Sequence, residues 1–320
     1  MRRIDVFNGD ADGVCALHQL RLAEPVESEL VTGVKRDIQL LDRVQAGPGD
    51  RVTVLDISLN SNRVGLMRLL DAGASVDYFD HHHAGEVPKH SKLHARIDLS
   101  AGACTSILVD RHLAGRHRLW AITAAFGDNL EKSARSMAES ESLSETQMGQ
   151  LARLGECLNY NGYGDSLEDL HFHPAQLYAE IRPFDDPFRF AAESPAFAKL
   201  DAGLREDAAR ADGLQARQQS AFSAAYILPD AAWARRVSGV FANRLANENP
   251  ARAHAVLTSN LHGDFTVSVR APIAKPQGAD TLCLGYPTGG GRTGAAGINR
   301  LPAAGLDEFL ASFKSHFSQL

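Results

Sequence analysis

The sequence predicts an α/β protein: a parallel sheet with helices on both faces, followed by a smaller α+β domain. Three observations carry this prediction. Short runs of β-branched and apolar residues alternate with helical patterns in the first part of the chain. Acidic residues directly follow these runs, as they do where parallel strands end in ligand-binding loops. Beyond residue 195 the pattern changes to short strands and a glycine tract.

Length and composition indicate two domains, which we place at residues 1–195 and 223–320, joined by a linker helix at 196–222. The chain has 320 residues, 44% of them hydrophobic, so each domain can bury a core. The net charge of −6 argues against long duplex DNA as a partner. Without a long apolar run or a signal sequence, we expect no membrane partner and a cytoplasmic location. Four widely spaced cysteines with no CxxC pair favour buried free thiols.

Two strand-helix units open the chain, and each carries carboxylates at the end of its strand. Residues 4–7 form the first strand, and the loop that follows contains Asp10 and Asp12 before a helix at residues 14–22. The second strand, residues 52–55, ends at Asp56 and precedes a helix at 61–72 with Gly73 just after it. A plain acidic turn is the alternative for the first loop.

The third strand ends in the residues around which the chain is organised, Asp80, His81 and His82. An acid and adjacent imidazoles that converge where a strand ends have the geometry of a metal site. A His-rich surface turn is the alternative. A helix is expected at residues 105–114, and a strand-like apolar run at 120–126 leads into Asp128. Because the carboxyl ends of parallel strands share one sheet edge, we expect these side chains to converge.

Residues 130–220 have a polar, largely helical pattern that is interrupted at 159–164. The pattern around His171 and His173 favours a solvated loop over a metal site, since no acid is spaced to join them. Residues 198–220 are rich in alanine and charge and predict the helix between the domains.

The C-terminal part predicts short strands at residues 236–241, 254–257 and 265–270, and an amphipathic helix at 306–317. Alternation in the third of these strands aims Arg270 away from the apolar face. Glycines 289–291 precede Arg292, and a glycine tract with a guanidinium fits phosphate, with a helix starting soon after. A flexible loop with a stray arginine is the alternative. Lys35 and Arg36 are further candidates for phosphate contact.

With these motifs in hand, the chain resembles the DHH phosphoesterase superfamily with its DHH-associated C-terminal domain. The motifs are Asp10-Ala11-Asp12-Gly13, Asp56, Asp80-His81-His82 and Asp128, with the tract Gly289, Gly290, Gly291, Arg292 as the C-terminal signature. The resemblance implies a DHH metal-binding catalytic domain and a smaller phosphate-binding domain across a cleft. It also implies two divalent ions, manganese before magnesium, which carboxylate and imidazole ligands suit.

By this resemblance, Asp10 would hold the first ion, Asp12, His81 and Asp128 the second, and Asp56 would bridge them. His82 and Asp80 would be catalytic residues, with His82 protonating the leaving oxygen and Asp80 orienting the metal ligands. Two-metal in-line attack on phosphorus is the implied mechanism. Arg270, Gly289, Gly290, Gly291 and Arg292 would bind the substrate.

Two departures from the family pattern stand out. Many relatives have His or Asp where this chain has Asn8 or Val6, which puts the binding of the first ion in doubt. The glycine tract usually ends in His and here ends in Arg292, which can bind phosphate but cannot transfer a proton at neutral pH.

The predicted function is hydrolysis of small phosphate esters: short single-stranded oligonucleotides in an exonuclease-like reaction, dinucleotides or nucleoside bisphosphates. A pyrophosphatase or polyphosphatase, and a nucleotide-sensing module with little turnover, are the alternatives. The oligomeric state is left open, with a homodimer as one option.

Overall fold

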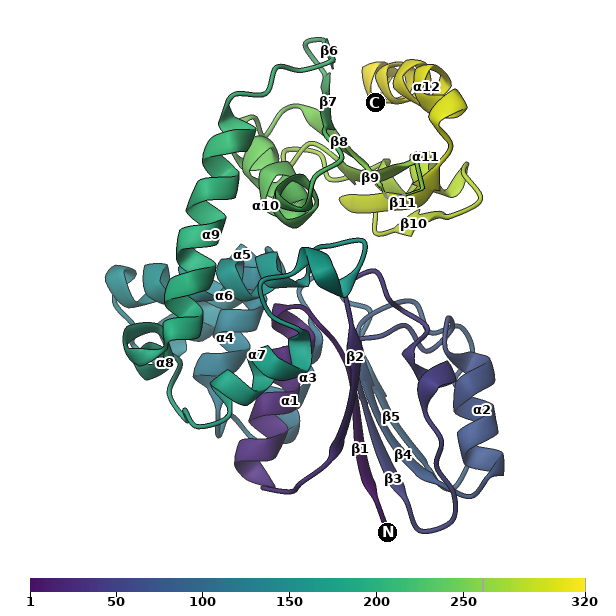
Figure 1. Ribbon diagram of the computed structural model, residues 1–320, viewed down its shortest axis with the longest axis vertical. Helices are drawn as coiled ribbons and strands as arrows, with labels where there is room; N and C mark the ends of the chain where they lie inside the picture. The colour runs from purple at the N-terminus through teal and green to yellow at the C-terminus, as the bar shows by residue number, and fades with distance from the viewer. Residues whose placement is uncertain (261, 320) are drawn as a thin grey trace. The chain divides into compact units, whose positions relative to one another are not determined.

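A computed structural model describes residues 1–260 and 262–319 (Figure 1). The chain divides into two compact units. Unit 1 comprises Met1–Gly162 and Ser166–Asp201, and unit 2 comprises Tyr163–Asp165 and Ala202–Leu320. Each unit is described by itself. Within the described residues, no helix is both long and apolar enough to cross a membrane. All four cysteines are buried free thiols, as the sequence predicts.

The core of unit 1 is a parallel sheet with the strand order β2-β1-β3-β4-β5. Each neighbouring pair in this sheet is parallel. The strands are β1 (Arg3–Asn8), β2 (Glu29–Gly33), β3 (Arg51–Leu55), β4 (Ser75–Asp80) and β5 (Leu93–Ile97). The predicted strands at 4–7, 52–55 and 76–80 are present, whereas β2 and β5 were not predicted, because their residues are only partly apolar.

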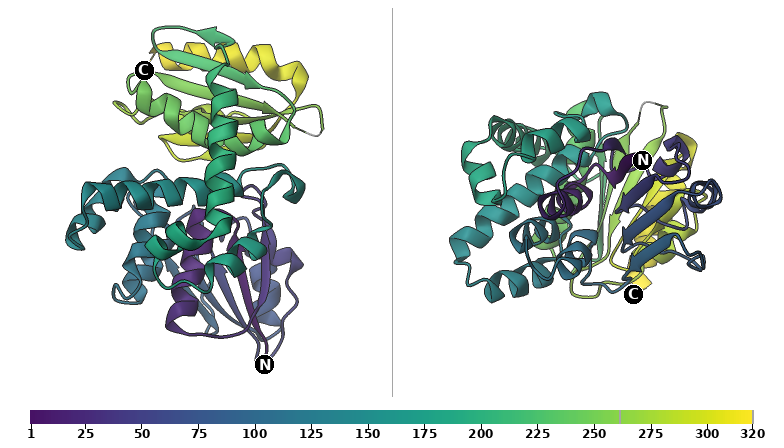
Figure 2. Two further views of the ribbon diagram at one scale, coloured as in Figure 1. Left: turned by 60° about the vertical axis from the view of Figure 1, so that its left-hand side comes forward. Right: turned by 90° about the horizontal axis from the view of Figure 1, so that it is seen from below.

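Helices cover both faces of this sheet, which confirms the predicted fold class. On one face, Leu66, Leu69 and Leu70 of α2 (Arg63–Asp71) pack with Val52 and Val54 of β3. The other face carries α1 (Ala11–Ala23), α3 (Thr105–His112) and the helices behind them (Figure 2). Because strand side chains alternate between faces, each strand of the middle of the sheet contributes to both layers. Gly73 follows α2 with φ 89°, as expected of a helix-ending glycine.

The run at residues 120–126 is helical, which corrects the strand-like interpretation. It lies inside α4 (Arg118–Gly127), which packs against α1 and α6 (Glu145–Gly162). A helix buried on several sides is apolar all round, so its sequence resembles a buried strand. Residues 159–162 likewise complete α6 instead of interrupting the helices. The remaining helices here are α5 (Glu131–Ser140), α7 (Pro174–Ile181), α8 (Pro187–Glu193) and α9 (Pro195–Asp212), with 3-10 turns η1 (Leu40–Arg43) and η2 (Leu167–Asp169).

Unit 2 contains a mixed sheet with the strand order β10-β11-β9-β8-β7-β6. Its strands are β6 (Gln218–Gln219), β7 (Ser223–Leu228), β8 (Ala253–Ser259), β9 (Phe265–Arg270), β10 (Gly289–Gly291) and β11 (Ala295–Leu301). Its helices are α10 (Ala232–Glu248), α11 (Ala279–Leu284) and α12 (Leu306–Gln319), with the 3-10 turn η3 (Ala303–Gly305). Phe309 and Phe313 of α12 pack with Val267 and Val269 of β9 in its core.

Two predictions for this part of the chain are wrong, and a third is right except for the end of the helix. Residues 236–241 belong to α10 and not to a strand, because their apolar side chains follow the helical period over a longer segment. The glycine tract is followed by the strand β11 and not by a helix. The tract itself forms β10, which pairs antiparallel with β11. The predicted helix at 198–220 ends at Asp212, and β6 follows it. The expected strands at 254–257 and 265–270 and the helix at 306–317 are present.

Candidate metal centre

The ends of three neighbouring strands bring six of the predicted metal-binding and catalytic residues to one edge of the unit 1 sheet. Phe7 of β1 lies beside Leu55 of β3, and Leu55 lies beside Phe79 of β4. The chain therefore leaves these strands at the same level, and the residues that follow share the carboxyl edge. These residues are Asp10, Asp12, Asp56, Asp80, His81 and His82, and all except His82 are buried.

His81 is held so that one ring nitrogen faces carboxylates. Its Nδ1 lies 2.8 Å from the carbonyl oxygen of Ala103, which can only accept, so Nδ1 carries a proton and Nε2 is the nitrogen that can bind a metal in the neutral ring. Nε2 lies 3.2 Å from Asp56 Oδ1, 3.8 Å from Asp12 Oδ2 and 4.0 Å from Asp128 Oδ2. With the acids ionised and the ring neutral, all of these atoms are acceptors, so a cation placed between them would be favourable.

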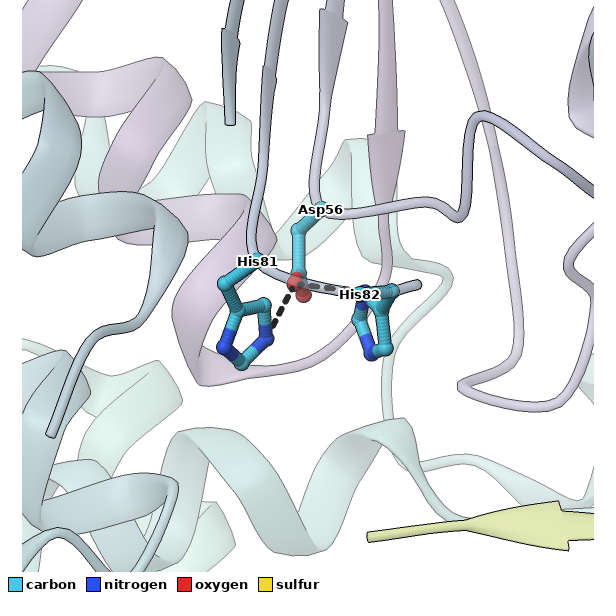
Figure 3. Close-up of side chains that lie close together, drawn as sticks. All are labelled: Asp56, His81 and His82. Carbon is cyan, nitrogen blue, oxygen red and sulfur yellow. Dashed lines mark ion pairs between the residues drawn. The ribbon is translucent and has the colours of Figure 1, made fainter. Parts of the chain in front are cut away.

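Two overlapping sets of side chains have the spacing of metal ligands. Asp56, His81 and His82 form one set, and Asp12, His81 and Asp128 form the other, with the ligand atoms of each set within 4.8 Å of one another. Figure 3 shows the Asp56 carboxylate between the two imidazoles. The second set is the one that the family resemblance assigns to the second ion. Carboxylates with one or two imidazoles fit manganese or magnesium.

Asp12 is oriented by the N-terminus of α3. The backbone N–H groups of Thr105 and Ser106 each donate to one of its oxygens at 2.7 Å. The hydroxyl of Ser106 also donates to the backbone carbonyl of Asp12 at 2.8 Å. The first N–H groups of a helix have no partners inside it, so a carboxylate placed there is stabilised and fixed. No sequence signal indicated this contact, because 93 residues separate Asp12 from Thr105.

Asp56 is buried among other carboxylates. Burial, and then the charges of Asp12 and Asp10, raise its pKa well above the ordinary value. Its backbone has φ 60°, in the left-handed region that few residues other than glycine adopt. The Thr105 hydroxyl donates to Asp56 Oδ1 at 3.3 Å. Strained backbone and raised pKa together mark a residue kept for a purpose other than stability.

Asp80 and His82 form a hydrogen-bonded pair beside the candidate metal ligands. His82 Nδ1 lies 2.7 Å from Asp80 Oδ1, and the backbone N–H of His82 donates to the same oxygen at 3.2 Å. Burial lowers the pKa of His82, but the hydrogen bond and charge of Asp80, together with Asp56, outweigh it and raise the pKa above its usual value. The pair therefore favours a protonated His82.

Asp10 and Asp128 share a partner that the sequence favoured for a different role, Lys35. The Lys35 ammonium bonds to Asp10 Oδ2 and lies 3.7 Å from Asp128 Oδ1 and 3.2 Å from Asn159 Oδ1. Asp128 reaches the site from the C-terminal cap of α4, and Asn159 from α6. Lys35 is thus directed at the acid cluster, where a phosphate contact was expected.

The predicted substrate residues lie together in unit 2. Arg270 ends β9 beside Ala295 of β11, and its Nε donates to Asn243 Oδ1 of α10 at 2.7 Å. Residues Gly289–Gly291 form β10, and Arg292 belongs to the turn that joins β10 to β11. A side chain at position 289 would meet the Cys283 carbonyl oxygen at 1.7 Å, so that glycine serves packing. Gly290 has open space around it, so close packing does not require a glycine there.

The two histidines of the 171–173 segment have partners away from the acid cluster. His171 Nε2 lies 2.8 Å from the hydroxyl of Tyr160, and His173 Nδ1 accepts from the Ala175 backbone at the start of α7. Neither belongs to a set with metal-ligand spacing among the described residues. Both rings instead hold the chain next to α6 and α7.

The chain matches no protein-family model and no curated protein sequence, but solved structures resemble it. The exonuclease RecJ bound to manganese has a TM-score of 0.63 and 16% identity, over 100% of this chain and 91% of that one. RecJ from Thermus thermophilus in complex with Mn²⁺ has a TM-score of 0.65 and 19% identity, over 100% of this chain and 52% of that longer one. PggH, a pGpG-specific phosphodiesterase from Vibrio cholerae, has a TM-score of 0.57 and 14% identity, over 100% of this chain and 99% of that one.

These likenesses identify the fold. The chain has the fold of DHH superfamily proteins such as RecJ, with the N-terminal α/β unit and the C-terminal mixed-sheet unit both matched. The fold expected from the four N-terminal motifs and the glycine tract is confirmed.

Proposed function

We propose that this chain is a metal-dependent phosphoesterase that hydrolyses small phosphate esters, with short oligonucleotides and dinucleotides as the substrate class. The observation that carries the proposal is the position of His81 Nε2, which faces Asp12, Asp56 and Asp128 with the spacing of ligands to one metal ion. A divalent ion bound by these residues would polarise a phosphate oxygen and allow water to act as a nucleophile at neutral pH. Manganese is the ion we expect, and magnesium is the alternative.

The residues around this position have distinct tasks. Asp12 and His81 are fixed by the backbone of residues 103–106, so the ligand set is preorganised. His82 is the proposed general acid, because Asp80 favours its protonated form and 41% of its side chain is exposed to an incoming substrate. Arg270 and Arg292 are the proposed phosphate contacts, together with the backbone of Gly289–Gly291.

The neighbouring structures support this substrate class. RecJ is an exonuclease and PggH a pGpG-specific phosphodiesterase, so both act on phosphodiester bonds of nucleotides. The net charge of −6 and the 7% aromatic content favour the smaller substrate, because a long strand needs a basic track and stacking surfaces. Buried free thiols are compatible with the reducing cytoplasm.

A substrate panel tests the proposal. Purified protein is incubated with Mn²⁺, Mg²⁺ or a chelator and offered pGpG, adenosine bisphosphate, pyrophosphate or polyphosphate. Metal-dependent hydrolysis of pGpG or the bisphosphate, absent in Asp56→Asn and retained in the exposed control Glu139→Gln, is expected. Orthophosphate released only from pyrophosphate or polyphosphate would replace the proposal with a pyrophosphatase. Nucleotide binding without turnover would replace it with a sensing module.

A further inference from the structure

We propose that Lys35 supplies one of the cationic charges of the metal centre, so that the cluster binds a single divalent ion and Asp10 is not a metal ligand. This inference deepens the proposed function and rests on the same site. It departs from the two-ion centre that the family resemblance implies. The oxygens that surround the Lys35 ammonium are the first observation in its favour.

Three side-chain oxygens from three helices meet at the ammonium of Lys35. They are Asp10 Oδ2, Asn159 Oδ1 at 3.2 Å and Asp128 Oδ1 at 3.7 Å. Asp10 caps α1, Asn159 belongs to α6, and Asp128 caps α4. An ammonium has three N–H donors and no acceptor, so this oxygen-rich position suits it.

The backbone of Lys35 is fixed, which holds the side chain toward the cluster. Its N–H donates to the carbonyl oxygen of Gly162 at 2.8 Å, and its carbonyl oxygen accepts from Asn8 Nδ2 at 3.2 Å. Asn8 is one of the positions at which the family resemblance leads one to expect His or Asp, and here its amide donates to the Lys35 backbone instead. The Lys35 side chain is 24% exposed, unlike a solvated surface lysine.

Asp10 has both carboxylate oxygens engaged. Oδ1 accepts from the backbone N–H groups of Asp12 and Gly13, at 3.1 Å each, and thereby caps α1. Oδ2 bonds to Lys35. Neither set with metal-ligand spacing among the described residues includes Asp10. A divalent ion on Oδ2 would have to displace the ammonium or lie against it, and like charges at that separation repel strongly away from bulk water.

Asp128 connects the Lys35 position with the metal position. Its Oδ1 is 3.7 Å from the ammonium, while its Oδ2 is 4.0 Å from His81 Nε2. One carboxylate therefore lies between two cation positions, as a bridging ligand does between two ions. Lys35 would offset part of the negative charge of Asp10 and Asp128 there. An ammonium offers no coordination site, so only an ion held at His81 would supply Lewis-acid chemistry.

Manganese stoichiometry tests the inference without reference to turnover. Wild type, Lys35→Met and the exposed control Lys132→Met are dialysed against excess Mn²⁺, and bound metal is counted by mass spectrometry. Electron paramagnetic resonance then separates isolated ions from coupled pairs. We expect one isolated ion per chain in wild type and in Lys132→Met, and a second ion in Lys35→Met, where Asp10 becomes available. Two ions per chain in wild type, or identical binding in wild type and Lys35→Met, would overturn the inference.

Two further variants keep the test independent of whether Lys35→Met folds. Asp10→Asn should still bind one ion, because Asp10 is not a ligand, whereas Asp12→Asn should lose it. Loss of the ion in Asp10→Asn would overturn the inference as well. A protein that binds one ion but hydrolyses no ester refutes the proposed function and not the role of Lys35. A protein that binds two ions and hydrolyses pGpG refutes the role of Lys35 and supports the proposed function.

Discussion

His82 Nδ1 lies 2.7 Å from Asp80 Oδ1, and this bond joins a fully buried carboxylate to a ring that remains 41% exposed. The other oxygen of Asp80 accepts a hydrogen bond from the backbone N–H of Leu59 at 3.4 Å. A carboxylate anchored in this way fixes the orientation of the imidazole and favours its protonated form. The arrangement suits a group that donates a proton to a leaving oxygen.

The general-acid role proposed for His82 predicts that the loss of rate in His82→Gln depends on the leaving group. General acids typically contribute about 10²–10⁴-fold to a rate. We expect a loss of this order with a nucleoside leaving group and a much smaller loss with 4-nitrophenol, which departs without protonation. The measurement is kcat for a dinucleotide and for a 4-nitrophenyl phosphodiester, with the exposed neighbour His83→Gln as the control. Equal losses for both leaving groups would show that His82 is not the proton donor.

The buried charge of Asp56 predicts that Asp56→Asn does not lower the melting temperature without metal but removes the stabilisation by Mn²⁺. Without metal, the burial and neighbouring charges that raise its pKa also penalise the folded state, so Asp56→Asn should melt at the same or a higher temperature than wild type. Asparagine also tolerates the left-handed backbone at this position. With Mn²⁺, wild type should gain melting temperature and Asp56→Asn should not. The measurement is thermal unfolding in chelator and in Mn²⁺, with the exposed Asp71→Asn as the control. A variant that gains as much from Mn²⁺ as wild type would remove Asp56 from the ligand set.

The glycine tract predicts that substrate affinity, and not folding, is sensitive at position 290. Gly290→Ala meets no neighbouring atom within 4 Å, so the protein should fold normally. If the backbone there approaches a phosphate, the added methyl group should raise KM with little change in kcat. An unchanged KM would leave β10 with a packing role alone.

Arg270 and Arg292 predict a loss of affinity when either is replaced by alanine. Loss of one charge-assisted hydrogen bond costs on the order of 1.5–3 kcal/mol, or about ten- to a hundredfold in affinity. Asn243→Ala should have a weaker effect, because it removes only the group that positions Arg270. Substrate binding is measured by calorimetry at fixed metal occupancy, with Arg300→Ala, which pairs with Asp264 at the surface, as the control. Affinities equal to wild type would exclude both arginines from the substrate site.

Substrate length predicts faster turnover of short strands. The cations proposed for substrate binding would engage one or two phosphates, so further phosphates of a longer strand meet no matching positive charge and are repelled by a chain of net charge −6. Initial rates per strand end are compared for strands of two, five and twenty nucleotides in Mn²⁺. The rate should fall with length, and the fall should be smaller at high salt, because salt screens the repulsion of the additional phosphates. Rates that are equal or rise with length would point to a strand-binding surface beyond the proposed residues.

The buried His18 predicts that unit 1 loses stability in mild acid. Burial, only partly opposed by the bond between Nε2 and the Phe184 carbonyl oxygen, lowers the pKa of His18 to about 4. Between pH 6.5 and 4 the unfolded chain then binds more protons than the folded one, so stability falls as the pH falls through this window. At pH 5 the loss attributable to His18 is about 2 kcal/mol.

Chemical denaturation monitored by tryptophan fluorescence measures the contribution of His18 to this loss of stability. Trp120 touches His18 edge-on with 4.6 Å between ring centroids, and a Trp233→Phe background leaves Trp120 as the reporter. In this background, His18→Gln should lose less stability than its parent between pH 7 and pH 5, whereas the exposed control His94→Gln should match the parent. The same loss in His18→Gln and its parent would place the acid sensitivity elsewhere.

The sequence by itself determined three central strands of unit 1 and the acids and histidines that follow them. Asp10, Asp12, Asp56, Asp80, His81 and His82 could be placed at one sheet edge, because parallel strands end at the same edge whatever their neighbours are. The apolar alternation of residues 265–270 likewise determined a strand. These signals are local: a period of two, a turn, and a polar residue directly after a buried run.

Only the tertiary structure decided how the site is completed. Asp128 reaches it from the end of a buried helix, which a uniformly apolar run could not reveal. The N–H groups that hold Asp12 lie 93 residues away, and Asn159 lies 124 residues from Lys35. Such contacts depend on which helices pack together, and packing is set by the whole core and not by any local period. The direction of the Lys35 ammonium was decided in the same way, by Asn8 and Gly162 holding its backbone beside Asp10.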